Sequence, residues 1–409
     1  MYYADCGTLR SESMKKILIC FLALLIVAGF LFGQEAEENT QLSSYLRNFA
    51  RASLSTKIQI LQDAERVDLE GMGPLYEKAV EFVIDNQMLL KADNAARQLA
   101  IIAVRLIGDS GYTEAKYELW DLFTIEKETL VRVQCMESLG VVGTGDKRII
   151  DRINSWVSQK NTLFMTGQKP DYQVFGAAID ALGNLGDPSS FPIIFTSMSL
   201  SFSEDITKRA RNALYNIEGE FTDLIVRVIE QNSILEKLSA LQLALSEDRL
   251  SEDEKGEVAE KALEIGLETT TPDASEKAQL REMRYTAIRA LTERNWSRAT
   301  PLVIRHFDIT VMEYDRGIAR KGNFLEAIAG LGAMATHEAA VRLNLYLDLL
   351  NTYKEQERAV DEQIILAVIN NLGKLGDKVA IDNLLYVGYL NYSQTVKNAA
   401  REAINNLRT

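Results

Sequence analysis

The chain has 409 residues, of which 47% are apolar and 25% are charged, a composition typical of folded and not of disordered proteins. Its formal net charge is −13, and no dense cluster of lysine and arginine occurs along it. Because phosphate binding needs a concentrated basic face, a nucleic-acid partner is not expected.

The N-terminus has the pattern of an export signal. Lys15 and Lys16 precede an uncharged run over residues 17–32, and a polar stretch follows from Gly33. As a helix this run would be about 24 Å long, shorter than a hydrocarbon core of about 30 Å. We therefore expect residues 1–33 to be a cleaved signal peptide, with an uncleaved anchor as the alternative. Met14 makes a more usual start for such a signal, so we expect the start to be misassigned.

An export signal predicts a bacterial envelope protein, with the periplasm as the expected location and a signal anchor in the inner membrane as the alternative. Contact with the membrane is expected only if the signal is not cleaved. Cys20 lies early in the apolar run and follows Ile19, which does not fit a lipid-bearing cysteine. After cleavage Cys135 is the one cysteine left, so no intramolecular disulfide can form.

A repeated turn motif is the most informative feature of the sequence. Its plainest copies read MESLGVVGTGDKRIIDRI (136–153), IDALGNLGDPSSFPIIF (179–195), IAGLGAMATHEAAVRLNLYL (328–347) and INNLGKLGDKVAIDNLLYV (369–387). The leucines that precede the turns, together with a weaker copy near Leu243, give a mean period of about 38 residues. They are Leu106, Leu139, Leu182, Leu214, Leu291, Leu331, Leu372 and Leu407. Two helices and two short turns fit this period.

Within each copy the apolar residues recur at threes and fours, as in Ile365, Ile369 and Leu372, which indicates helices. Gly183 and Gly373 are predicted to end their helices in the left-handed conformation. The sequence thus predicts an all-α fold, an α-solenoid of about eight helical hairpins over residues 50–409 that ends in a capping helix. Residues 34–49 are expected to form a polar leader and the start of the first helix, with opening helices over 45–63 and 74–84.

The segments LGNLGD and LGKLGD, each followed by an apolar helix, resemble HEAT-repeat proteins, including the bacterial HEAT-like group that contains phycobilisome lyases. The resemblance covers most of residues 50–408. It implies a right-handed superhelix whose second helices line a concave binding surface, and it leaves the function open.

Catalytic, cofactor-binding and metal-binding residues are not expected. The two histidines, His306 and His337, lie 31 residues apart without a nearby histidine or cysteine. The glycines near Gly143 match no phosphate-binding motif and are interpreted as helix ends. Cys135 is expected to be a buried, inert thiol.

Tyrosines gather on the last two second helices, with Tyr346 and Tyr353 on one and Tyr386 and Tyr389 on the next. Tyrosine is enriched at binding surfaces because it combines a large contact area with a polar group. Our hypothesis is that these residues, together with Arg342, line a groove for a partner. Packing between repeats is the alternative interpretation.

Two segments, 158–173 and 312–323, are predicted to be long excursions from the short-turn pattern. Arg316 and Arg320, with Lys321, give the second of them a local positive charge that an acidic partner could contact. A solvated loop is the alternative.

These features favour a non-enzymatic scaffold that binds another protein through its concave or loop-bearing surface, without a cofactor. The alternative is an accessory or lyase-like protein that holds a small molecule or prosthetic group. A third reading is a structural component that stays anchored by an uncleaved signal.

Overall fold

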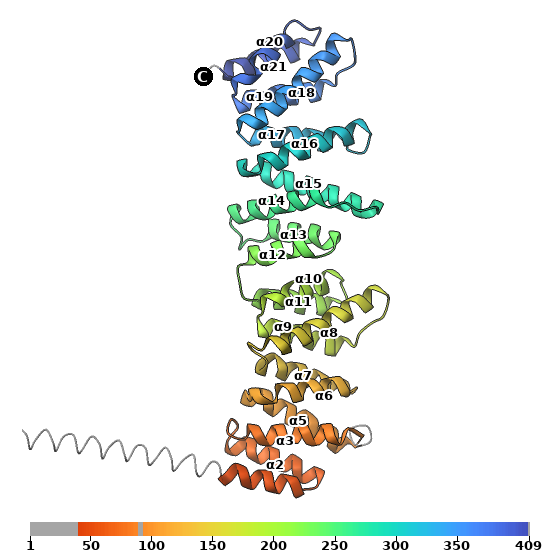
Figure 1. Cartoon of the computed structure of the whole chain (residues 1–409), viewed down its shortest axis with the longest axis vertical. Coiled ribbons are helices and arrows are strands. Elements are labelled where there is room, and N and C mark those ends of the chain that lie inside the picture. Colours follow the sequence, from red (N-terminus) through yellow and green to blue (C-terminus); the bar gives the residue numbers. More distant parts are fainter. Residues whose placement is uncertain (1–39, 89–92, 408–409) are drawn as a thin grey trace, which may run out of the picture. The chain divides into compact units, whose positions relative to one another are not determined.

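The computed structural model describes residues 40–88 and 93–407, and within these ranges the chain forms helices and no strand. The predicted all-α class is therefore confirmed. The chain divides into two compact units (Figure 1). Unit 1 contains the described residues up to Ser190 and Ser201–Ile217, and unit 2 contains Phe191–Leu200 and the described residues from Glu218 onward.

Unit 1 is built from antiparallel helical pairs. After a helix over residues 40–51 come α2 (Leu54–Val67), α3 (Gly73–Asp85), α5 (Asn94–Ser110), α6 (Lys116–Ile125), α7 (Thr129–Val142), α8 (Lys147–Met165), α9 (Tyr172–Leu185) and α11 (Glu204–Asn216). Helices α5, α7, α9 and α11 pack against one another in that order, while α6 and α8 pack against the helices that follow them. Cys135 is fully buried in α7, as the sequence predicted.

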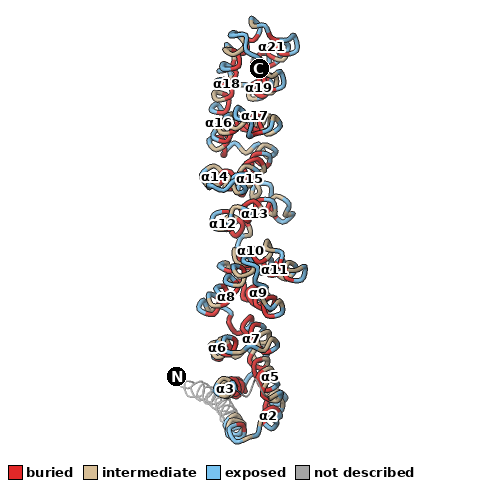
Figure 2. The backbone as a smooth tube through the Cα atoms, turned by 90° about the vertical axis from the view of Figure 1, so that its right-hand side faces the viewer, coloured by how far each residue is buried: buried red, intermediate tan, exposed pale blue. Residues whose placement is uncertain are grey.

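Unit 2 repeats this arrangement. Its helices are α10 (Phe191–Ser199), α12 (Phe221–Gln231), α13 (Ile234–Ser246), α14 (Glu252–Glu268), α15 (Ala274–Glu293), α16 (Thr300–Asp315), α17 (Lys321–Ala333), α18 (His337–Glu355), α19 (Glu362–Leu375), α20 (Ile381–Val387) and α21 (Gln394–Leu407). The odd-numbered helices from α13 to α21 pack in series, and so do the even-numbered helices from α12 to α20. Figure 2 shows the buried residues where neighbouring helices face one another.

Glycine and aspartate of the turn motif act as caps. Gly186 and Gly376 end α9 and α19 at φ +67° and +68°, in the left-handed region that glycine enters without steric cost. Asp377 then caps the next turn, because its carboxylate accepts a hydrogen bond from the backbone N–H of Val379 at 2.9 Å. A capping box between Ser251 and Glu254 starts α14.

The prediction for the first glycine of the motif is wrong. Gly183 and Gly373 lie inside α9 and α19, and neither takes a positive φ. A methyl group at Gly183 would lie 2.8 Å from the Cα of Ala213 in α11, and one at Gly373 would lie 3.1 Å from the Cα of Ala403 in α21. The first glycine therefore allows close approach of neighbouring helices, and the second ends the helix.

Other predicted boundaries also change. Residues 45–63 do not form one helix, because Ala52 and Ser53 are not helical and separate two helices. The predicted excursions are mostly helical: α8 continues to Met165, and only residues 316–320 separate α16 from α17. The predicted signal peptide lies outside the described residues. Within residues 40–88 and 93–407, no helix combines the length and hydropathy needed to span a bilayer.

Candidate functional site

Helices α18 and α20 are joined side by side through asparagines. The Nδ2 of Asn344 donates to the carbonyl oxygen of Val379 at 3.1 Å, and the Nδ2 of Asn383 donates to the Oδ1 of Asn344 at 3.0 Å. Asn351 is buried and donates to the carbonyl oxygen of Asn383 at 3.1 Å. The two bonds of Asn383 join α18 directly to α20, and the bond to Val379 joins α18 to the turn that precedes α20, so together they fix the two helices in register.

Large apolar side chains lie exposed on this helix pair. Leu345 and Leu349, one turn apart on α18, are 58% and 38% exposed, while Leu343, Leu347 and Leu350 of the same helix are buried. On α20, Leu385 is 44% exposed and its neighbours Leu384 and Val387 are buried. With Tyr386 and Tyr389, these residues form what we call the α18–α20 surface: Leu345, Leu349, Leu385, Tyr386 and Tyr389.

Two of the predicted tyrosines belong to this surface. The hydroxyl of Tyr386 donates to the Oε1 of Glu355 on α18 at 3.0 Å, which holds the ring between the two helices. This contact raises the pKa of Tyr386 above its ordinary value. Tyr389 lies in the turn after α20 and is 85% exposed, more than any other large apolar or aromatic side chain among the described residues. Its ring is thus available for contact.

The other two tyrosines, Tyr346 and Tyr353, pack against side chains within the fold. Tyr346 is 8% exposed, and its ring packs edge-on against Phe307 and Phe324 with centroids 5.4 and 5.7 Å apart. Burial raises the pKa of its hydroxyl. Tyr353 is half-buried, and the guanidinium of Arg358 stacks 4.0 Å above its ring. Tyr346 is therefore a core residue, and Tyr353 makes a local contact.

The predicted arginines lie on two different elements. Arg342 pairs with Asp308 of α16, with a nitrogen–oxygen distance of 2.6 Å, and lies over the ring of Phe307. Arg316 and Arg320 are exposed in the turn between α16 and α17. Arg342 is therefore paired within the fold, and Arg316 and Arg320 lie in the second predicted segment.

Two acidic side chains accompany the α18–α20 surface. Asp348 of α18 and Asp382 of α20 are exposed, and neither has an ion-pair partner among the described residues. Unpaired carboxylates beside apolar side chains favour a binding segment that carries both apolar and basic residues.

The two histidines have opposite environments. His306 is fully buried, with its ring packed edge-on against Tyr285 of α15. Burial lowers the pKa of His306 to about 3. His337 is exposed, and its Nδ1 lies 2.7 Å from the Oδ2 of Asp377, a contact that raises the pKa of the imidazole. Burial likewise raises the pKa of the Cys135 thiol, which makes the thiolate scarce at neutral pH.

The structure adds residues that the tyrosine pattern did not identify. Leu345 and Leu349 could have been recognised from the sequence of α18, where leucine occupies positions 343, 345, 347 and 349 and so covers more of the helix than one buried face requires.

Over the part of the chain that the structure describes, no group of three or more histidine, cysteine, aspartate or glutamate side chains is placed to hold a metal ion. No protein-family model matches the chain, and no curated protein is significantly similar to it.

Proposed function

We propose that this protein is a non-enzymatic scaffold, a HEAT-like right-handed α-solenoid of the bacterial envelope that binds another protein through its second helices. The observation that carries the proposal is the number of large apolar side chains left exposed on α18 and α20, both of which are second helices of their hairpins. Exposed apolar clusters on otherwise polar surfaces mark interaction sites.

The solenoid reading draws support from the way the hairpins pack. In each unit the first helices contact one another in chain order, which is the nearest-neighbour pattern of repeat proteins. Gly140, Gly183 and Gly373 occupy the same place in their motif copies, and a methyl group at each would lie 3.1 Å or less from a Cα of the next first helix. One stacking contact is thus repeated along the sequence.

The partner that fits the α18–α20 surface is an amphipathic segment with apolar and basic side chains. Leu345, Leu349 and Tyr389 would bury apolar area, and Asp348 and Asp382 would pair with the basic groups. Ion pairs at a solvent-exposed rim are screened by salt, so part of the affinity should fall as ionic strength rises.

The test is crosslinked affinity capture of the tagged mature protein from its own cell envelope, comparing wild type with Leu345→Lys. Full burial of a leucine side chain is worth about 1.5 to 3 kcal/mol, so a lysine at this position should weaken capture by at least about tenfold. The matched control is Leu235→Lys, since Leu235 of α13 is 54% exposed and Leu345 is 58% exposed.

A reproducible set of partners that depends on Leu345 and is retained by the Leu235 variant is the expected result. Equal recovery by wild type and both variants, with circular dichroism unchanged, would refute this surface as the binding site. Recovery of no specific protein, together with visible absorbance in the purified material, would favour a holder of a prosthetic group.

The export part of the proposal concerns the N-terminus. Cleavage of the signal near Gly33 would leave a mature chain that begins at Gln34. N-terminal sequencing of the protein from the soluble envelope fraction should read QEAEEN. A chain recovered only from membranes with residues 14–33 attached would replace this proposal with a signal-anchored protein.

A further inference from the structure

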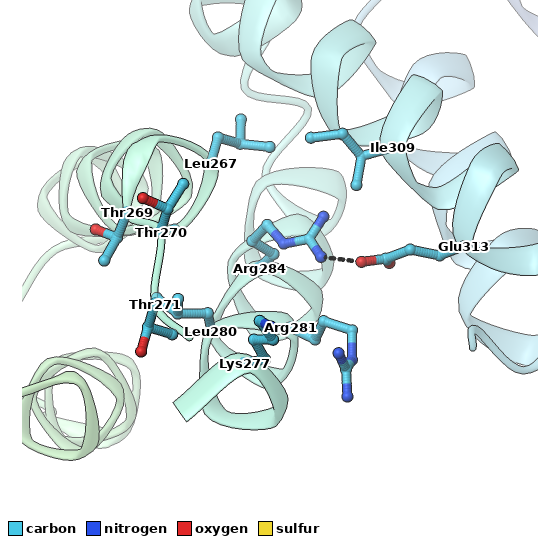
Figure 3. A pocket seen from close by; sticks show the side chains of 11 residues that line it. Leu267, Thr269, Thr270, Thr271, Lys277, Leu280, Arg281, Arg284, Ile309 and Glu313 are labelled. Carbon is cyan, nitrogen blue, oxygen red and sulfur yellow. Dashed lines mark hydrogen bonds and ion pairs between the residues drawn. The ribbon is translucent and has the colours of Figure 1, made fainter. Parts of the chain in front are cut away.

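Unit 2 contains a pocket of about 270 Å³ that is separate from the α18–α20 surface (Figure 3). One wall is the connection after α14, with Thr269, Thr270 and Thr271, and the other consists of side chains of α15 and α16. Its size suits a small molecule and not a folded segment of protein.

The α15 wall is basic. Lys277, Arg281 and Arg284 recur at intervals of four and three residues and so share one face of the helix. Glu313 is the one acidic side chain in the lining, which leaves a net charge of +2 in the pocket of a protein whose formal net charge is −13. Arg281 has no ion-pair or hydrogen-bond partner among the described residues.

Glu313 offsets only one of the three positive charges, and both oxygens of its carboxylate already accept hydrogen bonds. Its Oε1 accepts a hydrogen bond from the Nη2 of Arg284 at 2.6 Å, and its Oε2 accepts one from the hydroxyl of Tyr285 at 3.2 Å. Burial, with the Glu313 charge nearby, raises the pKa of Tyr285 to about 12, so this hydroxyl stays protonated and continues to donate.

Arg284 also has a donor without a partner. Its side chain is 6% exposed, and its Nη1 is buried with no hydrogen-bond acceptor. Figure 3 shows this second arm of the guanidinium directed away from Glu313, between Leu267 and Ile309, two further residues of the lining. A buried guanidinium nitrogen without an acceptor costs free energy, and a bound anion would supply that acceptor.

We infer that this pocket binds a small dianion, a phosphate-bearing or dicarboxylate molecule, held by Arg284 and Arg281 with Lys277 at the rim. A net charge of +2 matches a dianion, and a guanidinium binds phosphate and carboxylate oxygens with the same geometry. The inference is independent of the protein-binding proposal, because the two sites share no residue.

The test is isothermal titration calorimetry of the mature protein with inorganic phosphate and, separately, with succinate. Arg284→Gln risks unfolding because it would leave Glu313 buried without its partner, so the informative variant is Lys277→Gln/Arg281→Gln, which changes the less buried cations. Loss of two charged donors should weaken binding by at least about tenfold. The matched control is Lys374→Gln, at an exposed lysine on α19.

Saturable binding of one anion per chain, weakened in the double variant and unchanged in the control, is the expected result. Binding of phosphate alone would identify a phosphate-bearing ligand, and binding of succinate alone a dicarboxylate. Absence of saturable binding of either anion up to about 10 mM would overturn the inference. An equal loss of anion affinity in the Lys374 variant would also overturn the inference, because the attraction would then come from surface charge in general.

Discussion

Replacement of Gly183 by alanine tests the close contact between neighbouring first helices. The added methyl group would lie 2.8 Å from both the Cα and the Cβ of Ala213, and a backbone Cα cannot rotate out of the way. Helices α9 and α11 would therefore have to separate by several tenths of an ångström. Such overpacking costs about 1 to 3 kcal/mol, and the better helix propensity of alanine returns about 0.5 to 1 kcal/mol. With the midpoint of each range, the expected net loss is about 1.3 kcal/mol.

Hydrogen exchange followed by mass spectrometry can measure this loss in α9 and α11 themselves. Exchange from these two helices should become roughly tenfold faster in Gly183→Ala. The matched control is Gly322→Ala in α17, where a methyl group would meet no atom within 4 Å and should stabilise the helix slightly. Exchange from α9 and α11 that is as slow as in wild type, or slower, would refute the close-packing argument.

Three further outcomes follow from buried and paired groups. The pKa of buried His306 is lowered from 6.5 to about 3, so between these pH values the unfolded chain binds a proton that the folded chain does not. The free energy of unfolding should therefore decrease as the pH falls from 6.5 to 3, by at most about 1.4 kcal/mol per pH unit from this group. In NMR titrations its ring signals should stay constant between about pH 8 and 5 while those of His337 titrate above 6.5; titration of both together would contradict the assignment. Cys135 should react with a thiol reagent only after the chain is unfolded, and rapid labelling in native buffer would show that it is not buried. Glu313→Ala should destabilise unit 2 by about 3 to 5 kcal/mol in urea unfolding, because it leaves Arg284 buried and unpaired, and a loss well below 1 kcal/mol would mean that the pair is solvated.

Much of the fold could be predicted because one turn motif recurs. The leucines that precede the turns predicted a chain of helical hairpins, because their spacing fits two helices and two short turns. The conformation of each glycine could not be assigned in the same way. In LGKLGD both Gly373 and Gly376 can adopt the left-handed region, and only the packing of Ala403 against Gly373 decides which of them ends the helix.

The candidate surface was only partly predictable, because tyrosines in a repeat protein serve two purposes. Tyr346 and Tyr389 are equivalent by composition, yet Tyr346 packs on Phe307 from the neighbouring hairpin and Tyr389 follows the last turn of α20 into solvent. Which of them is exposed depends on how each helix is rotated about its axis relative to the neighbouring helices. The pocket of unit 2 was missed for a similar reason, since Arg284 and Glu313 are 29 residues apart and meet only when α15 packs beside α16.

The central claim is that the α18–α20 surface is where a partner binds, and site-specific photo-crosslinking in the native cell envelope tests it most directly. A photoreactive phenylalanine analogue at Tyr389 should give a discrete adduct with one partner protein. The same analogue at Tyr215 of α11, which is 45% exposed in unit 1, should not give that adduct. The same adduct from both positions, or none from Tyr389 while the protein remains folded, would contradict the claim.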